Sequence, residues 1–482
     1  MEICDCSSVL TAFSLFAAIL VEQFHYRFLN SGIPRPYRGP CSFSTLRYGG
    51  RWEAPCGRVR RQLDSGSRSA RETGKSNNET GPVDFREEIK AFEYALGEME
   101  ERAGEILKDN LQDPTLRAGL SLIGWKPSQR EYPAQSEAIE WWLYDGEQAV
   151  TPEDSSLVFN AAVSNFTFVQ FSDENNFVID QRGHSAWIEG EASTFLSPND
   201  KRLRLNTTVE GVAYGPDGVI VTTSDGSCVQ ADYAVCTFSL GVLQRENAIS
   251  FEPALPTWKK TAIEMFEIGV YTKIFLQFPS KFWPADKEYF LYADPHERGW
   301  YPIWQSLDVE GFFPGSHILF VTLTGEQSYR AEKMTDEETL EEVMTVLRLM
   351  FPGVNIPQPS AFTYPRWSDT PWAYGSFSVW PTGTTLEMHE NLRANVDRLW
   401  FTGEHTSASY FGYMQGAWFE GQDAGNRLAG LISGTCVGDP AAGECGERVS
   451  YHVLHGTTPE SEYNANNGWD EKGFHNGNYG KH

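Results

Sequence analysis

The sequence predicts an α/β fold of two or three domains. Its 482 residues are 40% hydrophobic and 13% aromatic, which indicates a globular chain too long for one core. Sheets are predicted from strand-like runs between residues 203 and 243 and from a strand followed by a helix near residue 400. Helical spacing between residues 85 and 143 supplies a helical layer. The formal net charge of −26 opposes nucleic-acid binding and would attract cationic ligands, although many acidic proteins bind none.

The N-terminal region, residues 1–83, is expected to be divergent or disordered. Residues 22–82 are rich in Arg, Gly, Ser and Pro and lack a sustained period. A dinucleotide-binding domain usually begins with a strand and the motif G-x-G-x-x-G at a helix N-terminus, and the sequence contains no such motif. The apolar run Val9–Val21 is too short to span a bilayer. The acidic residues Glu2 and Asp5 before it are unlike the basic start of a signal peptide.

From about residue 84 the spacing of apolar residues becomes helical. In Phe85–Asp109 they recur every three or four positions, and Leu111–Leu122 continues in the same manner. A short helix is expected over Ala138–Leu143, and an amphipathic helix over Thr335–Met350. These segments predict a layer of helices followed, later in the chain, by a structural helix.

Two regions between these helices have the pattern of strands. Apolar residues alternate between residues 203 and 243, and Gly215–Gly218 supplies a turn. An ordinary β-meander explains that alternation equally well. The run Val270–Leu276 places Lys273 at the inward phase of an apolar strand, where burial is costly unless the ammonium group is paired. A solvent-facing lysine on a half-exposed strand is the alternative.

The segment Leu399–Leu428 predicts a strand, a turn and a helix in succession. Leu399–Phe401 is short and apolar, and Thr402–Glu404 follows as a turn that ends in a carboxylate. Helical spacing then puts mostly small residues on one face, so this helix can approach its neighbours closely. A strand that leads into such a helix directs backbone N–H groups at an anionic ligand. A tightly packed core helix is the alternative. The residues on this face of the predicted helix are Ala417, Gly421, Ala424 and Leu428.

The cysteines and sequons bear on metal binding and compartment. The eight cysteines show no metal-ligand spacing, so no metal site is expected. Cys436 and Cys445 could close a small loop in an exported protein. Sequons at Asn78, Asn165 and Asn206 permit export without requiring it. The compartment is left open between cytoplasm and export, with export slightly favoured.

Several motifs, in order along the chain, resemble those of the flavin-dependent amine oxidases, most closely the polyamine oxidases of plants and fungi. The densest is FTGEHTS followed by an aromatic residue and Gly-Tyr, at Phe401–Tyr413. The resemblance covers about residues 84–430. A weak similarity of Arg47–Arg51 to the family's R-x-G-G-R segment is better explained by chance in an Arg- and Gly-rich stretch. The other matching segments are Phe168–Gly183, Ser239–Leu243, Tyr271–Leu276, Phe278–Pro284, Pro365–Asp369 and Tyr374–Pro381.

The resemblance implies a two-domain architecture in which both domains are discontinuous in sequence. Residues 201–264 and 371–430 would form a Rossmann-like FAD-binding domain, incomplete at the N-terminus. Residues 84–200 and 265–370 would form a substrate-binding domain with a mixed sheet and helices. Residues 431–482, rich in Gly, Asn and Asp, would be a polar, solvated tail.

The resemblance also implies residues that bind FAD. Glu404, in the turn with Gly403, would bond the ribityl–pyrophosphate part of the cofactor. The helix beginning at Met414 would point its N-terminus at the flavin pyrimidine. Val209 would contact the adenine through its backbone, and Trp367 would pack near the flavin.

A second set of residues would act on the substrate. In the family, the lysine at the position that corresponds to Lys273 holds a water molecule against flavin N5, and Lys273 would do the same here. Tyr271 would form a wall of the substrate tunnel. Phe377 and Tyr413 would sandwich the substrate nitrogen, which excludes water and orients the reacting C–H bond. Relatives with covalent flavin carry Cys where this chain has Ser376, so we expect noncovalent FAD.

One position departs from the family pattern. Family tunnels often carry an acidic residue that meets the substrate ammonium group, and the position aligned with it here is Val150. Glu147 and Glu153 lie close in sequence and could compensate. The sequence does not decide between them.

The implied reaction is the oxidation of a secondary amine of spermine or spermidine. Hydride would pass to flavin N5, water would cleave the imine, and dioxygen would reoxidise the flavin. The products would be an aldehyde, an amine and hydrogen peroxide. A monoamine or amino-acid oxidase on the same scaffold is one alternative, and a catalytically dead remnant that does not hold FAD is another. The oligomeric state is open.

Overall fold

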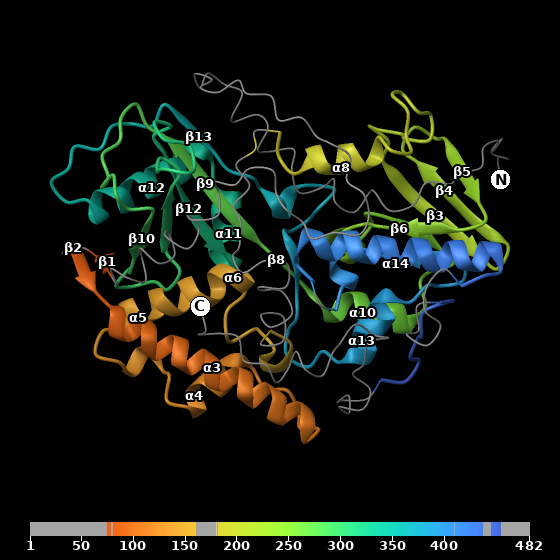
Figure 1. Cartoon of the computed structure of the whole chain (residues 1–482), viewed down its shortest axis with the longest axis horizontal. Coiled ribbons are helices and arrows are strands. Elements are labelled where there is room, and N and C mark those ends of the chain that lie inside the picture. Colours follow the sequence, from red (N-terminus) through yellow and green to blue (C-terminus); the bar gives the residue numbers. More distant parts are fainter. Residues whose placement is uncertain are drawn as a thin grey trace.

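The computed structural model describes residues 75–78, 81–160, 180, 182–408, 410–436 and 445–454. Two groups of elements lie side by side in Figure 1. One contains β9 to β13 with helices beneath them, and the other contains β3 to β6 with α10, α13 and α14. The predicted segment Arg47–Arg51 and most of Phe168–Gly183 lie outside the described residues.

The first group is built on a seven-stranded mixed sheet, ordered β13-β9-β12-β11-β10-β1-β2. β9 runs antiparallel to β12, with Lys273 opposite Thr322, and β1 pairs parallel with β10. Every residue of β12 is buried, as expected for an interior strand whose two faces are both covered. The strands are β1 (Lys75–Asn78), β2 (Gly81–Asp84), β9 (Tyr271–Gln277), β10 (Tyr289–Tyr292), β11 (Ile303–Ser306), β12 (Ile318–Thr324) and β13 (Ala361–Thr363).

Strands β1 and β2 correct the prediction of loop or disorder over residues 22–82. They form an antiparallel hairpin at the edge of the sheet, with Lys75 opposite Asp84. The hairpin has a weak sequence signal because it is short and polar (KSNN and GPVD). Its position depends on pairing with β10, more than 200 residues further along the chain.

The predicted helical layer is confirmed. α3 (Arg86–Lys108) and α4 (Leu116–Leu122) carry most of it, and α5 (Pro133–Glu140) leads directly into a π-helical turn, Trp141–Asp145. These helices lie below the seven-stranded sheet in Figure 1. The short helix expected over Ala138–Leu143 therefore begins earlier than predicted and ends as a π-helix. Three further helices follow: α6 (Gly146–Gln148), α11 (Gly325–Lys333) and α12 (Asp336–Met350).

The amphipathic helix predicted over Thr335–Met350 is confirmed as α12. Thr335 accepts a hydrogen bond from the backbone N–H of Glu338, and the Glu338 side chain accepts one from the N–H of Thr335. This capping box satisfies two N–H groups that the helix itself cannot pair. It explains why the helix begins where it does.

The second group contains small sheets and several helices, of which α14 is the longest among the described residues. Leu399–Phe401 forms β15 as predicted and pairs parallel with β6. The predicted turn at Gly215–Gly218 joins β3 to β4. The strands are β3 (Val209–Gly215), β4 (Gly218–Thr223), β5 (Cys228–Ala231), β6 (Ala234–Cys236), β7 (Ser250–Glu252), β8 (Glu267–Gly269) and β14 (Phe377–Val379). The helices are α8 (Ser185–Ala192), α9 (Leu240–Gln244), α10 (Thr257–Met265), α13 (Leu386–Arg393) and α14 (Met414–Ser433).

Helix α14 packs through the small face that the sequence predicts. Ala417, Gly421, Ala424 and Leu428 are all buried. A methyl group added to Gly416 would lie 2.2 Å from the carbonyl oxygen of Tyr410. The start of this helix therefore lies against the turn that precedes it, and only glycine fits there.

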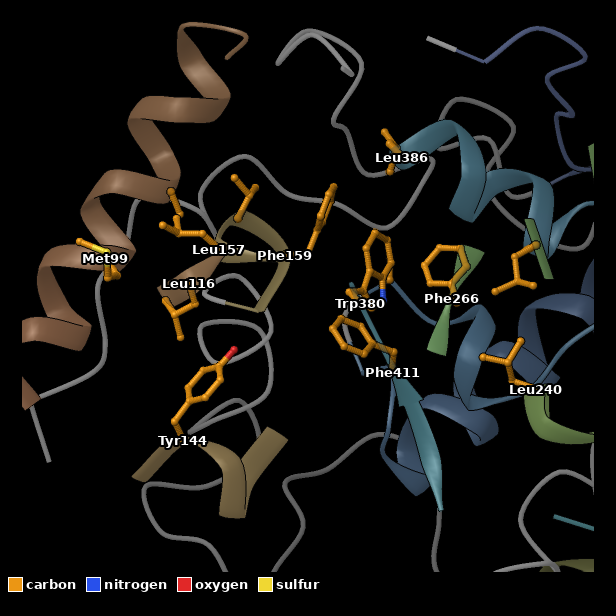
Figure 2. Close-up of a cluster of buried hydrophobic side chains, with 14 of the residues drawn as sticks. Met99, Leu116, Tyr144, Leu157, Phe159, Leu240, Phe266, Trp380, Leu386 and Phe411 are labelled. Atoms are coloured by element: carbon orange, nitrogen blue, oxygen red, sulfur yellow. The ribbon is translucent and has the colours of Figure 1, made fainter. Parts of the chain in front are cut away.

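The two groups share one hydrophobic core around Trp380, which is 1% exposed. Its ring lies 4.3 Å from that of Phe159 and 4.8 Å from that of Phe266, measured between centroids. Figure 2 shows these rings with Phe411, to the right of the helical layer at Met99 and below the start of α13 at Leu386. The shared core fixes the helical layer relative to α13 and α14.

Among the described residues after α14, residues 445–454 differ from the solvated tail expected over residues 431–482. Arg448 is 8% exposed and pairs with Glu420 and Asp423 on α14. Cys436 and Cys445 form a disulfide that closes the loop before it. The prediction was wrong for residues 445–454 because a buried ion pair, invisible in the composition, holds this segment in place.

Candidate active site

Strand β9 presents two candidate catalytic residues on one face. Tyr271 and Lys273 are half-buried, whereas Ile274 and Leu276 on the other face are 0% exposed. The Lys273 ammonium nitrogen lies 4.6 Å from the centre of the Tyr271 ring and 5.2 Å from that of Phe320. Lys273 is therefore neither fully buried nor simply solvent-facing, because its ammonium group lies near two aromatic rings.

Phe377 lies next to Tyr271 because the pairing of β14 with β8 brings it there. Phe377 pairs with Gly269, two residues before β9 begins. Its ring centre is 6.0 Å from that of Tyr271. Ser376 strengthens the junction, since its hydroxyl oxygen accepts a hydrogen bond from the Tyr271 N–H at 2.9 Å. The residue that replaces the cysteine of covalent flavoproteins thus has a structural role here.

Tyr413 joins the same cluster from the start of α14. A methyl group added to the preceding residue, Gly412, would lie 3.2 Å from Cδ2 of Phe377. The Tyr413 hydroxyl donates a hydrogen bond to Glu147 at 3.0 Å. The Tyr271 hydroxyl donates one to the carbonyl oxygen of Gly146 at 2.9 Å. These contacts link Gly146, Tyr271, Phe377, Tyr413 and Glu147, with Gly412 as the step from Phe377 to Tyr413, and we call this group the aromatic ring cluster.

Glu147 is the acidic residue that the sequence left undecided, and the structure brings it into the aromatic ring cluster. Glu147 is exposed to solvent, although protein atoms lie close around its carboxylate. Partial desolvation by these atoms raises its pKa, while the hydrogen bond from Tyr413 and the charge of Lys273 act in the opposite direction. Glu153 instead pairs with Arg117 at 2.6 Å, in the helical layer. Val150 is half-buried just after α6. A sequence motif could not identify Glu147, because its position depends on the π-helical turn before it.

The turn after β15 forms a second part of the site. The Glu404 carboxylate accepts hydrogen bonds from the Ser378 N–H, the Ser378 hydroxyl and the Gly412 N–H, at 3.1, 2.7 and 2.6 Å. Burial raises its pKa, and these three bonds oppose the shift. Three bonds leave about one of the four acceptor positions of a carboxylate for a ligand.

The residues around this turn fit the phosphate-bearing part of a dinucleotide. Ligands of open α/β sheets bind beyond the carboxyl ends of parallel strands, and Thr402 follows β15 directly at that end. Its hydroxyl group is buried and has no hydrogen-bond partner among the described residues. Gly403 is buried, and the N-terminus of α14 at Met414 begins eleven residues later. An unpaired hydroxyl and a helix N-terminus are what an anionic ligand uses.

Two predicted cofactor residues lie outside the aromatic ring cluster. Val209 begins β3 in the four-stranded sheet, where it pairs with Thr223. Trp367 begins a 3₁₀ turn, Trp367–Asp369, and its carbonyl oxygen accepts a hydrogen bond from the Gly375 N–H. Their proposed contacts with adenine and flavin stay predictions. Within the residues that the structure describes, no group of acidic, histidine or cysteine side chains could hold a metal ion.

Comparison with known proteins places these residues in a family context. Residues 95–429 match the model of the flavin containing amine oxidoreductases. Polyamine oxidase 1 of Zea mays is 43% identical over 299 residues, 60% of this chain and 59% of the maize protein. Polyamine oxidase 7 of Oryza sativa subsp. japonica is 40% identical over 68% of this chain and 70% of the rice protein. The chain thus spans about three fifths of the length of the maize relative.

Solved structures with similar folds are much more distant in sequence. A putrescine oxidase bound to putrescine has a TM-score of 0.55 and 15% identity, covering 72% of this chain and 75% of its own. Cyclohexylamine oxidase from Brevibacterium oxydans has a TM-score of 0.55 and 20% identity, with 73% and 76% covered. These similarities support the two-domain fold.

Proposed function

Because this chain belongs to the flavin containing amine oxidoreductase family, we propose that it is an FAD-dependent polyamine oxidase. Its substrates would be spermine or spermidine, oxidised at a secondary amine to give an aldehyde, an amine and hydrogen peroxide. The observation that carries the proposal is the gathering of Lys273, Tyr271, Phe377 and Tyr413 into one cluster at the start of α14. The polyamine oxidases of maize and rice provide the sequence support.

The cofactor would be held noncovalently at the turn after β15. Glu404 and Thr402 offer a carboxylate and an unpaired hydroxyl, and α14 offers the N–H groups of its first turn. When bound, the cofactor would supply a two-electron acceptor for hydride from the amine carbon, with dioxygen as the final oxidant and hydrogen peroxide as its product. The protein supplies binding, orientation and exclusion of water.

The aromatic side chains would position the reacting amine. Phe377 lies against Gly412, the residue before Tyr413, so the two rings would flank an amine placed between them and limit its contact with water. The Lys273 ammonium group, set over the Tyr271 ring, would hold a water molecule close to the reacting atoms. The amine must be neutral to lose hydride, so we expect activity to rise towards alkaline pH.

Export is proposed alongside this activity. The disulfide between Cys436 and Cys445 supports it, because disulfides persist in oxidising compartments. Asn206, in the third sequon, is exposed. Among the described residues, no helix is long and apolar enough to cross a bilayer. Recovery of the chain in the medium, with a mass that falls after glycosidase treatment, would support export, and retention in the cytoplasm would contradict it.

A substrate panel tests the proposed activity. Purified chain supplied with FAD is mixed with spermine, spermidine, benzylamine or an amino acid, and release of hydrogen peroxide is followed. We expect release with the polyamines only. Release with benzylamine or the amino acid alone would overturn the substrate class, and release with none would overturn the proposed activity.

A further inference from the structure

Glu147 lies on a turn that the fold holds in an unusual conformation. The π-helical turn Trp141–Asp145 precedes it, and Ala149 after it has a positive φ of 62°. Both features are uncommon for these residue types and are found disproportionately at functional sites. Ala149 is 1% exposed, and a methyl group added to Gly269 would lie 3.0 Å from its Cβ. The turn is therefore fixed against the start of β9.

The same turn is anchored from its other side by an ion pair. Both carboxylate oxygens of Asp145 accept hydrogen bonds from Arg298, at 2.6 and 2.7 Å. Asp145 is 1% exposed, and Arg298 also bonds the buried Glu140 at 2.9 Å. A bidentate arginine–carboxylate pair fixes direction as well as distance. Asp145 therefore holds the residues that follow it in one orientation.

Two consecutive residues of this turn each hold one tyrosine of the aromatic ring cluster. Gly146 accepts from the Tyr271 hydroxyl through its carbonyl oxygen, and Glu147 accepts from the Tyr413 hydroxyl through its carboxylate. The tyrosines come from β9 and from the start of α14, which are 142 positions apart in sequence. The turn thus sets the separation of two side chains that no local contact could relate.

We propose that Glu147 is a positioning residue, which orients the Tyr413 ring beside the contact of Phe377 with Gly412 and thereby fixes the amine for reaction. This inference rests on the proposed function. Glu147 does not contact the reacting atoms in this role and acts through the Tyr413 hydroxyl. Its carboxylate has one hydrogen bond from a neutral donor and no ion pair within 4 Å among the described residues. Its removal therefore breaks one hydrogen bond and takes away a negative charge that interacts with Lys273, which is why the test includes Glu147→Gln.

A double-mutant cycle with Glu147→Ala and Tyr413→Phe tests the proposal. Each single change removes the same hydrogen bond, so each should lower kcat/KM about tenfold. The double variant should be no worse than either single variant. The loss should fall mainly on kcat, because orientation rather than affinity is removed. Glu147→Gln keeps an acceptor oxygen and should restore part of the rate.

The matched control is Glu189→Gln, a carboxylate change on the exposed face of α8. It should leave kcat and KM unchanged. The same double-mutant cycle is then measured by thermal unfolding of the FAD-free chain. The changes in Tm of the two single variants should again be non-additive. Additive losses in kcat/KM, or a Glu147→Ala variant within twofold of wild type, would overturn the proposal. A wild-type chain that oxidises no polyamine would refute the proposed function, while the thermal cycle would still decide whether Glu147 and Tyr413 are coupled.

Discussion

Glu404 Oε2 accepts a hydrogen bond from the backbone N–H of Gly412 at 2.6 Å, which ties the turn after β15 to the start of α14. The same carboxylate accepts two bonds from Ser378, one residue beyond Phe377. One side chain therefore connects the proposed cofactor site to the aromatic ring cluster. A change at Glu404 should affect both.

The first prediction concerns Glu404→Ala. The change leaves the N–H groups of Ser378 and Gly412 without their acceptor, and an unpaired buried donor costs about 1–3 kcal/mol. We expect FAD binding to weaken at least about tenfold, measured by quenching of flavin fluorescence on binding to FAD-free chain. Glu189→Ala on α8 is the control. An affinity within twofold of wild type would show that Glu404 does not organise the cofactor site.

The second prediction concerns Lys273→Met, which keeps the length of the side chain and removes its charge. A positioned group that handles water or protons contributes about 100-fold or more to rate. We expect kcat to fall by about that factor while the FAD content stays unchanged. Lys287→Met is the control, because the half-buried Lys287 pairs with the exposed Asp286 and belongs to neither part of the proposed site. A kcat within threefold of wild type would remove Lys273 from the proposed mechanism.

The third prediction compares two glycine-to-alanine changes. The methyl group of Gly416→Ala would lie 2.2 Å from the Tyr410 carbonyl oxygen, so the start of α14 must move. We expect loss of FAD binding and a lower thermal midpoint. The methyl group added by Gly97→Ala on α3 would have no neighbouring atom within 4 Å, so this change should stabilise the chain by about 0.5–1 kcal/mol. Retention of FAD by Gly416→Ala would contradict the close approach of α14.

The fourth prediction concerns Arg448→Met after the disulfide loop. The change leaves Glu420 and Asp423 with one buried cation fewer, and breaking a buried ion pair costs about 3–5 kcal/mol. We expect a loss in the lower part of that range, because Arg393 and Arg427 still contact these carboxylates. Urea unfolding measures it. Arg348→Met, which breaks an exposed pair, should cost less than about 1 kcal/mol.

The same ion pair predicts how stability depends on pH. Desolvation raises the pKa of Asp423, but the charges of Arg448 and Arg427 outweigh it and bring the pKa to about 2. This value lies below the usual value of about 3.9, so the contribution to stability is complete above about pH 4. It is lost as the pH falls towards 2. Arg448→Met should flatten that acid loss, and an unchanged acid profile would contradict the assignment.

Segments defined by their own local pattern could be predicted from the sequence. The strand, turn and helix of Leu399–Leu428 follow from apolar spacing and small residues, and the structure has them as β15 and α14. The hairpin at Gly215–Gly218 follows from its turn residues. The cap at Thr335 is equally local. In each case the residues that determine the conformation are neighbours in the chain.

Features set by distant partners could not be predicted. β1 and β2 form because β10 offers a free edge, and the segment around Arg448 is ordered because α14 carries its acidic partners. Glu147 is the clearest case. Its neighbour Asp145 is fixed by Arg298, and its own partner Tyr413 lies 266 positions away. No spacing within the sequence of this turn carries that information.

The most direct test of the account is the visible spectrum of the FAD-loaded chain mixed with spermidine in the absence of air. We predict that the yellow absorbance of oxidised flavin disappears on mixing and returns when air is admitted, with release of hydrogen peroxide. A spectrum that spermidine and spermine both leave unchanged, or a chain that stays colourless after FAD is supplied, would contradict the assignment as a polyamine oxidase.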